Sequence, residues 1–285
     1  MSKNVIALVY DFDGTLSPKT MQNYTVLPNL GVEKTSEFWA EVTKECVQTG
    51  AENTLVWMRK IKELAEGEHK LITKAYFKKC ARNIQYFKGV EKFFDEINGY
   101  VRKVSRGKML VRHYIISAGL KEILDGISIR KKFHNIFGSE YHYDCSGKPD
   151  FPKVVITDTI KTQYLFRINK GKEKISESIN EHMPEKDRPI PFENIIYIGD
   201  GLTDVPAMAL TKKNGGHAIA IYRAGHPRSI KTCKKLLHAN RVDFIALADY
   251  TKGRELYRDV TVSLDVVIKN YDFLRESEEN RRVRK

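Results

Sequence analysis

The sequence predicts an α/β fold in which a mainly parallel sheet forms the core and an all-helical segment is inserted into it. Short apolar runs rich in β-branched residues recur along the chain, and helical patterns separate several of them. One long stretch near the N-terminus shows only helical spacing. Two apolar runs are followed directly by aspartates with glycines close by. Ligands of a parallel sheet bind at this position, the carboxyl end of its strands.

Five runs have the length and composition of strands that are buried on both faces of a sheet. The first, 4–10, is almost continuously apolar, and the others cover 110–117, 154–157, 195–199 and 217–222, with 242–247 as a possible sixth. Gly147-Lys148-Pro149 lies between residues of strand character and predicts a short hairpin within 141–157.

Between about residues 16 and 100 the sequence favours helices, at 37–47, 54–65, 72–84 and 90–100. Leu55, Met58 and Ile61, for example, fall on one helical face. A connection between two strands usually needs one helix, so this stretch is too long to be a simple crossover. We therefore expect an α/β core formed by 1–16 and 96–275, a helical inserted domain at 17–95, and a charged, frayed tail at 276–285.

The composition is that of a globular protein, because 41% of the 285 residues are hydrophobic and 30% are charged. No stretch approaches about 18 uninterrupted apolar residues, so we expect no membrane span. The N-terminus lacks the pattern of a signal peptide, which argues against secretion. The four cysteines, Cys46, Cys80, Cys145 and Cys233, form no CxxC pair, so we expect reduced thiols in a cytoplasmic protein.

The net charge of +13 suits an anionic partner, but the basic residues are spread over several segments. No RNA-binding signature or zinc knuckle accompanies them. We therefore expect a largely solvated basic surface that also attracts a small anionic substrate, and no specific nucleic-acid partner. The sequence leaves the oligomeric state open.

Four aspartates are expected to converge at one edge of the sheet. Asp11 and Asp13 follow the first predicted strand in the sequence DFDGT, and Asp200 and Asp204 follow the run 195–199 in GDGLTD. The carboxyl ends of parallel strands share one edge, where ligands bind. Carboxylates gathered in this way repel one another unless a cation lies between them, and hard oxygen ligands suit Mg²⁺. An acidic turn without a metal is the plainer alternative for either motif alone.

Ser117 ends the predicted strand 110–117 and is followed by Ala118 and Gly119. A serine hydroxyl together with free backbone amides at a following helix start can hold phosphate oxygens. A serine in this position is also commonly a plain helix cap.

Together these motifs resemble the haloacid dehalogenase superfamily of phosphohydrolases, which has a Rossmann-like, mainly parallel α/β core. DFDGT matches its first motif, DxDxT, Ser117 matches the second, and Gly199 to Asp204 match the fourth, GDGxxD. The place of the helical insertion, between the first and second motifs, resembles the C1 cap of the phosphoserine-phosphatase-like branch. In that branch a glutamate soon after the first motif binds the amine of the substrate. The corresponding residues 16–22 of this chain contain no acid.

The third motif of the superfamily is a lysine between the second and fourth motifs. The candidates are Lys153, Lys161, Lys170, Lys172 and Lys174. We favour Lys161, since it opens a segment with helical spacing like the one that carries the lysine in phosphoserine-phosphatase-like members, and Lys170 is the second choice.

The resemblance implies a Mg²⁺-dependent phosphatase that acts on a small phosphorylated metabolite through an aspartyl-phosphate. Asp11 would be the nucleophile and Asp13 the general acid and base. Asp11, Asp200 and the backbone carbonyl of Asp13 would bind Mg²⁺.

The remaining motif residues would serve the phosphate and the metal. Ser117, Gly119 and Lys161 would bind the phosphate, and Asp204 would orient Lys161 or the surroundings of the metal. Two alternatives stay open: a phosphotransferase or phosphomutase on the same core, and a basic nucleic-acid-binding protein without enzymatic activity.

Overall fold

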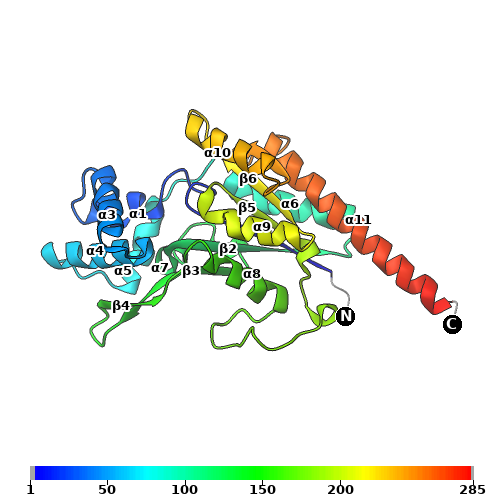
Figure 1. Cartoon of the computed structure of the whole chain (residues 1–285), viewed down its shortest axis with the longest axis horizontal. Coiled ribbons are helices and arrows are strands. Elements are labelled where there is room, and N and C mark those ends of the chain that lie inside the picture. The colour runs from blue at the N-terminus through cyan, green and yellow to red at the C-terminus, as the bar shows by residue number, and fades with distance from the viewer. Residues whose placement is uncertain (1–3, 284–285) are drawn as a thin grey trace.

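The computed structural model describes residues 4–283 and contains a seven-stranded sheet in the order β4-β3-β2-β1-β5-β6-β7 (Figure 1). All neighbouring strands are parallel except β3 and β4, which are antiparallel. The mainly parallel α/β fold is therefore confirmed. The strands are β1 (Val5–Tyr10), β2 (Leu110–Leu120), β3 (Asn135–Tyr143), β4 (Pro149–Val154), β5 (Ile195–Gly199), β6 (His217–Tyr222) and β7 (Phe244–Leu247).

Helices connect most of the strands. They are α1 (Met21–Tyr24), α2 (Val26–Asn29), α3 (Thr35–Thr49), α4 (Asn53–Gly67), α5 (Lys74–Cys80), α6 (Val90–Val104), α7 (Lys121–Leu124), α8 (Ile160–Lys170), α9 (Val205–Lys213), α10 (Pro227–His238) and α11 (Glu255–Val283). Short 3-10 turns are η1 (Ala81–Asn83), η2 (Arg130–Lys132), η3 (Glu185–Asp187), η4 (Phe192–Asn194) and η5 (Leu202–Asp204).

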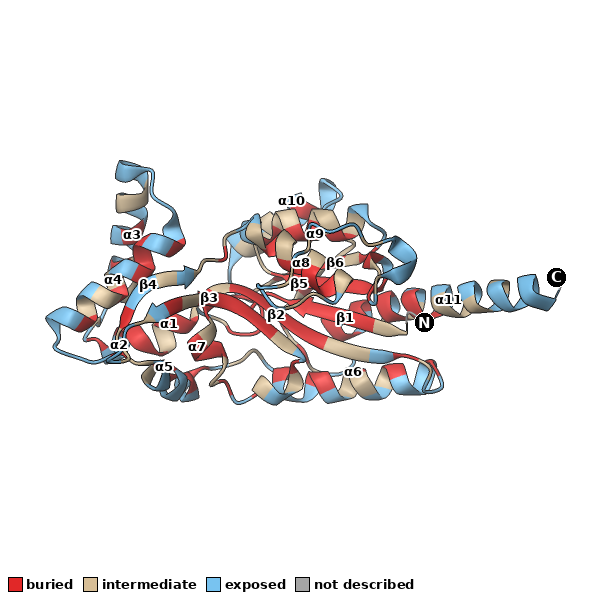
Figure 2. Ribbon diagram, turned by 90° about the horizontal axis from the view of Figure 1, so that it is seen from below, coloured by how far each residue is buried: buried red, intermediate tan, exposed pale blue. Residues whose placement is uncertain are grey.

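The central strand β1 is buried on both faces, which explains its continuous apolar run. Successive side chains of a strand point to opposite faces. Ile6 and Leu8 join a core cluster on the face that α6 and α11 cover, while Ala7 and Val9 join a second cluster with residues of α8, α9 and α10. Figure 2 shows these helices on the two sides of the sheet, with the buried strands between them.

The helices α3, α4 and α5 lie together at one end of the molecule, beside the β3–β4 hairpin (Figures 1 and 2). The hydroxyl of Tyr141 donates to the carbonyl of Met58 at 2.7 Å, and Lys148 pairs with Glu66 at 2.9 Å. The helix α6 lies elsewhere, against β2 and α11. The helix α4 thus contacts the sheet at the β3–β4 hairpin, whereas α6 is one of the helices that cover the sheet.

The predicted strand at 154–157 is wrong. Only Val154 of that run is in a strand, as the last residue of the antiparallel edge strand β4, whose Pro149 and Pro152 are tolerated at a sheet edge. The parallel neighbour of β2 is β3, which the sequence did not reveal because Ile136 and Phe137 are followed by glycine and polar residues. The predicted hairpin within 141–157 is confirmed in the turn between β3 and β4.

The tail also differs from expectation, because α11 continues through Val283 instead of fraying from residue 276. Arg275 and Glu279 form an i,i+4 ion pair at 3.3 Å within this extension, which Figure 1 shows projecting beyond the sheet. Lys285 and its neighbour lie outside the described residues. Across residues 4–283, no helix has both the length and the apolar character that a membrane crossing requires.

Candidate active site

Two neighbouring strands bring the predicted acids together. Asp11 follows β1 and Asp200 follows β5, and these strands are parallel neighbours in which Tyr10 pairs with Ile198. The amide of Asp11 donates to the carbonyl of Ile198 at 3.0 Å, which extends the ladder by one residue. Carboxylate oxygens of Asp11, Asp200 and Asp204 all lie within 4.8 Å of one another.

The turn after β1 is shaped so that Asp200 can approach it. The amides of Thr15, Leu16 and Ser17 all donate to the carbonyl of Phe12. Gly14 has φ of +82°, and a Cβ there would lie 2.1 Å from Oδ2 of Asp200. The glycine of DFDGT therefore serves both the left-handed backbone and the close approach of Asp200.

Asp13 lies in the same turn but is held differently. Its Oδ1 accepts from the backbone amide of Met21 at 2.7 Å, at the start of α1. It is not one of the three acids whose oxygens gather most closely. Asp13 is thus positioned by backbone contact with the first residues of the helical segment.

Lys161 lies among the acids, and the rival Lys170 does not. The Nζ of Lys161, in the first turn of α8, donates to Asp11 Oδ1 at 2.9 Å and to Asp204 Oδ1 at 2.7 Å, and the residue is 2% exposed. Lys170, at the end of the same helix, donates to the backbone carbonyls of Ile179 and Glu181. Only the first of the two candidates therefore reaches the acidic cluster.

Asp204 is fixed by a contact that the sequence did not suggest. The hydroxyl of Tyr197, in β5, donates to Asp204 Oδ1 at 2.7 Å. A Cβ at Gly199 would lie 2.4 Å from Asp204 Oδ2, so this glycine of GDGLTD makes room for the acid. Asp204 Oδ2 is buried and has no hydrogen-bond partner within the part of the chain that is described.

The cluster carries more negative than positive charge. Burial raises the pKa of Asp11 to about 6, against the lowering effect of Lys161. Burial and the neighbouring Asp11 and Asp204 raise the pKa of Asp200 to about 8. Burial alone would lower the pKa of Lys161, but the two carboxylates beside it raise it, so this ammonium stays charged.

The pKa of Asp13 is also raised well above its usual range, first by burial and then by Asp11. Four acids thus share one buried ammonium, and raised acid pKa values are the physical sign of charge that lacks a cation. For Asp200, no hydrogen bond or ion pair to another residue between 4 and 283 offsets this charge. The oxygen-only donor set and the unpartnered oxygens fit a hard divalent cation such as Mg²⁺.

Ser117 lies near the end of β2, the other strand beside β1, and it is buried. Its Oγ accepts from the amide of Gly119 at 3.0 Å. The strand continues to Leu120 before α7 begins, so no helix starts directly after the serine as the sequence had suggested. A Cβ at Gly119 would lie 2.0 Å from Cε of Met21, which shows how tightly this strand end meets the helical segment.

Arg223 was missed, although a signal for it exists. It directly follows β6, the neighbour of β5, just as Asp11 and Asp200 follow their strands. Its Nη1 donates to the carbonyl of Pro18 at 2.8 Å, a few residues after DFDGT. The rule that polar residues at strand ends share one edge would have included it. For Tyr197, inside a buried strand, the sequence holds no comparable signal.

Comparison with known proteins agrees with this geometry. A family model for haloacid dehalogenase-like hydrolases matches residues 8–209. An uncharacterized protein of Borreliella burgdorferi is 30% identical over 279 residues, which cover 90% of this chain and 95% of that protein.

Among solved structures, a phospho-aspartyl intermediate analogue of phosphoserine phosphatase matches with a TM-score of 0.55 and 20% identity, over 91% of this chain and 99% of that one. A substrate-bound phosphoserine phosphatase matches with a TM-score of 0.55 and 18% identity, over 90% and 97%. A hydrolase of the same family from Salmonella enterica serovar Typhi matches with a TM-score of 0.55 and 17% identity, over 85% of this chain and 66% of that one, just under two thirds of its length. These likenesses show the fold, and together with the family match they show that the chain belongs to the haloacid dehalogenase-like hydrolases.

Proposed function

We propose that the protein is a Mg²⁺-dependent phosphatase that hydrolyses a phosphate monoester of a small metabolite through an aspartyl-phosphate on Asp11. The observation that carries this proposal is the position of Lys161, whose ammonium contacts both Asp11 and Asp204 while Asp200 faces the same carboxylates. An ammonium ready to bind phosphate beside a carboxylate nucleophile is what phosphoryl transfer to an acid needs.

In the first step, a carboxylate oxygen of Asp11 attacks phosphorus and the bond between phosphorus and the ester oxygen breaks. Asp13 gives its proton to the departing alcohol. Burial, and then the neighbouring Asp11, raise the pKa of Asp13, which is the direction that a general acid needs, and the amide of Met21 holds its Oδ1 beside the proposed nucleophile. In the second step Asp13 takes a proton from water, the water oxygen attacks phosphorus, and the bond to Asp11 breaks to release phosphate.

Lys161 and the hydroxyl of Ser117 would hold the non-bridging phosphate oxygens, with the amide of Gly119 turning from Ser117 Oγ to the substrate. Asp204 would act through Lys161, because its Oδ1 already bonds Lys161 and Tyr197. Asp11, Asp200 and the backbone carbonyl of Asp13 would bind Mg²⁺. When bound, the ion would offset the repulsion between these acids and an anionic substrate.

We further propose that residues 17–95 act as a cap over a core formed by 1–16 and 96–275, with 276–285 as a charged extension. The amide of Phe87 donates to the carbonyl of Leu16 at 3.0 Å. The two connections that lead into and out of this segment therefore lie side by side. The proposed boundary of the cap needs one adjustment. Because α6 (Val90–Val104) packs against the sheet, we assign the whole of this helix to the α/β core domain. The four free thiols support a reducing, cytoplasmic location.

The test is a turnover assay with 4-nitrophenyl phosphate, combined with rapid acid quenching of the enzyme in the presence of a radiolabelled phosphate monoester. We expect turnover that needs Mg²⁺ and a protein-bound phosphate that alkali releases and that is missing from Asp11→Asn. Turnover without any trapped phosphoprotein would refute the aspartyl-phosphate route. No turnover of any monoester in a broad metabolite panel would refute the phosphatase itself.

A further inference from the structure

A second hollow lies at the same edge of the sheet as the acidic cluster. It has a volume of about 450 Å³ and opens where the chain passes from the core into residues 17–95 and back. Lys19, Lys88, Arg223 and His226 line it, together with one acid, Asp249. A hollow with this lining favours an anion.

The cations of this hollow form no ion pair within residues 4–283, although Lys88 interacts electrostatically with Asp249 and Arg223 with Asp200. Between residues 4 and 283, Lys19, Lys88 and Arg223 have no carboxylate within ion-pair distance. The Nε of Arg223 is buried and finds no hydrogen-bond partner among the described residues, and Lys19 Nζ lies 5.6 Å from the ring centre of Tyr24. Lys19 and Lys88 are exposed and Arg223 is half-buried, so the unsatisfied group of the hollow is the buried Nε–H of Arg223. A buried donor without a partner is costly, and an anionic ligand with the two flexible lysines around it would satisfy it.

Asp249 offsets only part of the positive charge of the hollow, through an electrostatic interaction with Lys88. Its Oδ1 accepts from the amide of Thr251 at 3.0 Å, and its Oδ2 lies 3.9 Å from Nε of Arg254. One acid that is already engaged faces three cations of the hollow. The N-terminus of α10, whose N-cap is His226, adds the positive end of a twelve-residue helix.

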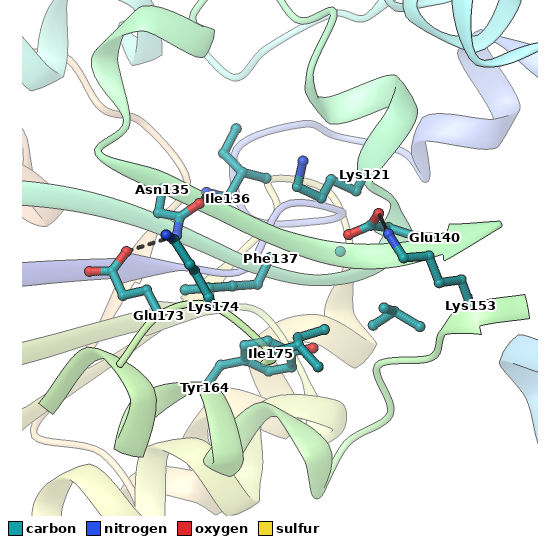
Figure 3. A pocket seen from close by; sticks show the side chains of 12 residues that line it. Lys121, Asn135, Ile136, Phe137, Glu140, Lys153, Tyr164, Glu173, Lys174 and Ile175 are labelled. Atoms are coloured by element: carbon teal, nitrogen blue, oxygen red, sulfur yellow. Dashed lines mark hydrogen bonds and ion pairs between the residues drawn. The ribbon is translucent and has the colours of Figure 1, made fainter. Parts of the chain in front are cut away.

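Another hollow, beside β3, shows the contrast (Figure 3). There Lys153 pairs with Glu140 at 3.2 Å, Asn135 donates to Glu173 at 2.7 Å, and Lys121 pairs with Asp125 at 2.7 Å. Most charges in that hollow are paired, although Lys174, which also lines it, forms no ion pair within residues 4–283. Unpaired cations line other hollows as well, since Lys79 and Arg82 form no ion pair within residues 4–283, so the hollow of Arg223 is distinguished by its position at the catalytic edge.

The hollow that Arg223 lines lies near the acidic cluster because of the order of the strands in the sheet. Arg223 follows β6 and Asp200 follows β5, and these strands are parallel neighbours with Gly199 paired to Ala220. Neighbouring strands are about 4.8 Å apart. Pro18, which accepts from Arg223, is part of the segment that follows DFDGT. Arg223, which lines the hollow, therefore lies about one strand spacing from Asp200 of the acidic cluster.

We propose that Arg223, Lys19 and Lys88 bind a second anionic group of the substrate, so that the preferred substrates are small phosphate monoesters that also carry a carboxylate or a second phosphate. This inference rests on the proposed phosphatase function, since it assigns the second anion to the substrate of that reaction. Two of the cations lie at the borders of residues 17–95 and the third lies in the core, so the anion would bridge both parts.

The first measurement is binding of non-hydrolysable phosphonates to the Mg²⁺-loaded protein by calorimetry. Propyl and butyl phosphonate are compared with 3-phosphonopropanoate, 4-phosphonobutanoate and the propane and butane bisphosphonates. We expect at least one two-anion ligand to bind about tenfold or more tightly than the alkyl phosphonate of equal length, as charge-assisted contacts allow. The carboxylate and bisphosphonate arms show which second anion is preferred.

The second measurement repeats the binding with Lys88→Gln, Lys19→Gln and Arg223→Gln. Each variant should lose most of the preference for the two-anion ligand. Arg223→Lys should keep part of it. The matched control is Lys234→Gln, an exposed lysine of α10 outside the hollow, which should keep the full preference. Circular dichroism checks that each variant is folded.

The outcomes separate this inference from the phosphatase proposal. Equal binding of one-anion and two-anion ligands, or a preference that survives in all three Gln variants, would overturn the second anion site even if monoesters are hydrolysed. A preference that depends on Lys88 and Arg223 would support the site even if turnover fails, in which case only the reaction would be abandoned.

Discussion

The Nζ of Lys161 lies 2.9 Å from Oδ1 of Asp11, although 150 residues separate the two in the chain. The pair is buried, and the same ammonium also binds Asp204. Lys161 therefore neutralises part of the charge that β1 and β5 bring together at the edge of the sheet. It does so from the first turn of α8, whose Leu165 and Ile168 are buried in the core. The packing of α8 against the core thus determines where the ammonium of Lys161 lies.

Replacing Lys161 with Met should destabilise the protein and abolish activity. Losing one partner of a buried ion pair costs about 3–5 kcal/mol. The deficit should shrink as the pH falls from 8 to 5, because Asp11, whose pKa burial already raises to about 6, can then take up a proton. Urea unfolding at several pH values measures this.

Lys170→Met is the matched control, because Lys170 bonds only backbone carbonyls of the following loop among the described residues. We expect it to keep turnover within about threefold of the wild type, as befits a change away from the chemistry. If Lys170→Met is the inactive variant and Lys161→Met is active, the assignment of the phosphate-binding lysine is wrong.

Asp11→Asn should fold and lose at least about 10³-fold in kcat, because an amide is a poor nucleophile and a weaker metal ligand. Its thermal midpoint should stay close to that of the wild type or rise, since one of the mutually repelling acids becomes neutral. Asp150→Asn, an exposed position on β4, serves as the control and should retain activity. Substantial phosphatase activity in the Asp11 variant would exclude this residue as the nucleophile.

Gly14→Ala should impair the site through Asp200. The added Cβ would lie 2.1 Å from Asp200 Oδ2 and would sit on a residue with φ of +82°. We expect loss of about 1–3 kcal/mol in stability from the backbone strain and a Mg²⁺ activation constant raised about tenfold or more.

The control for this prediction is Gly201→Ala, in the fourth motif. In the part of the chain that the structure describes, a Cβ at Gly201 would have no neighbour within 4 Å, and the φ of −150° at Gly201 is extended backbone. Its thermal midpoint and Mg²⁺ activation should therefore change little. Equal behaviour of the two variants in Mg²⁺ titrations would show that the close approach of Asp200 to the first motif does not matter.

The sequence was most informative where a buried strand ends. Asp11 and Asp200 could be placed at one edge because apolar runs of β-branched residues mark buried parallel strands, and the first polar residue after such a run must lie at the edge. The hairpin was predictable because Gly147-Lys148-Pro149 is a turn signal between residues of strand character, and Gly147 has the positive φ that such a turn favours. The same reasoning failed for β3, whose apolar part is too short to mark a strand.

Other features depend on tertiary packing and leave no local pattern. The bond from Tyr197 to Asp204 joins a strand residue to a 3-10 turn that has folded back over it. Lys161 and Lys170 are nine residues apart on one helix, and residue spacing alone could not decide which end faces the acids. The extent of α11 was missed because charged residues can belong either to a solvated helix or to a disordered tail.

Ca²⁺ should bind at the site but support little turnover. Chelation should remove activity and Mg²⁺ should restore it, whereas the larger and looser coordination shell of Ca²⁺ should misplace the attacking carboxylate of Asp11. Competition of Ca²⁺ with Mg²⁺ in the turnover assay measures this, and full inhibition at saturating Ca²⁺ is expected. Equal rates with the two ions would contradict the geometry, and an activity that survives chelation would contradict a metal requirement.

His113 should make the protein lose stability in acid, independently of the active site. The imidazole is buried in β2 between Tyr10 and Asn98, with Nδ1 3.0 Å from the hydroxyl of Tyr10 and Nε2 3.2 Å from Oδ1 of Asn98. Burial lowers its pKa to about 3, so the folded protein keeps this ring neutral. The unfolded chain takes up a proton near pH 6.5, so folding becomes less favourable as the pH falls from about 6.5 towards 3.

The expected contribution is at most about 1.4 kcal/mol per pH unit in the free energy of unfolding. Asp11 and Asp200 act in the opposite direction, because their raised pKa values let the folded state bind protons in the same range. The comparison must therefore be between variants: His113→Gln should remove about one proton from the slope of stability against pH. The exposed His238→Gln should keep the slope of the wild type. If urea unfolding between pH 4 and 8 gives the same slope for all three proteins, His113 is not the buried neutral group that the geometry indicates.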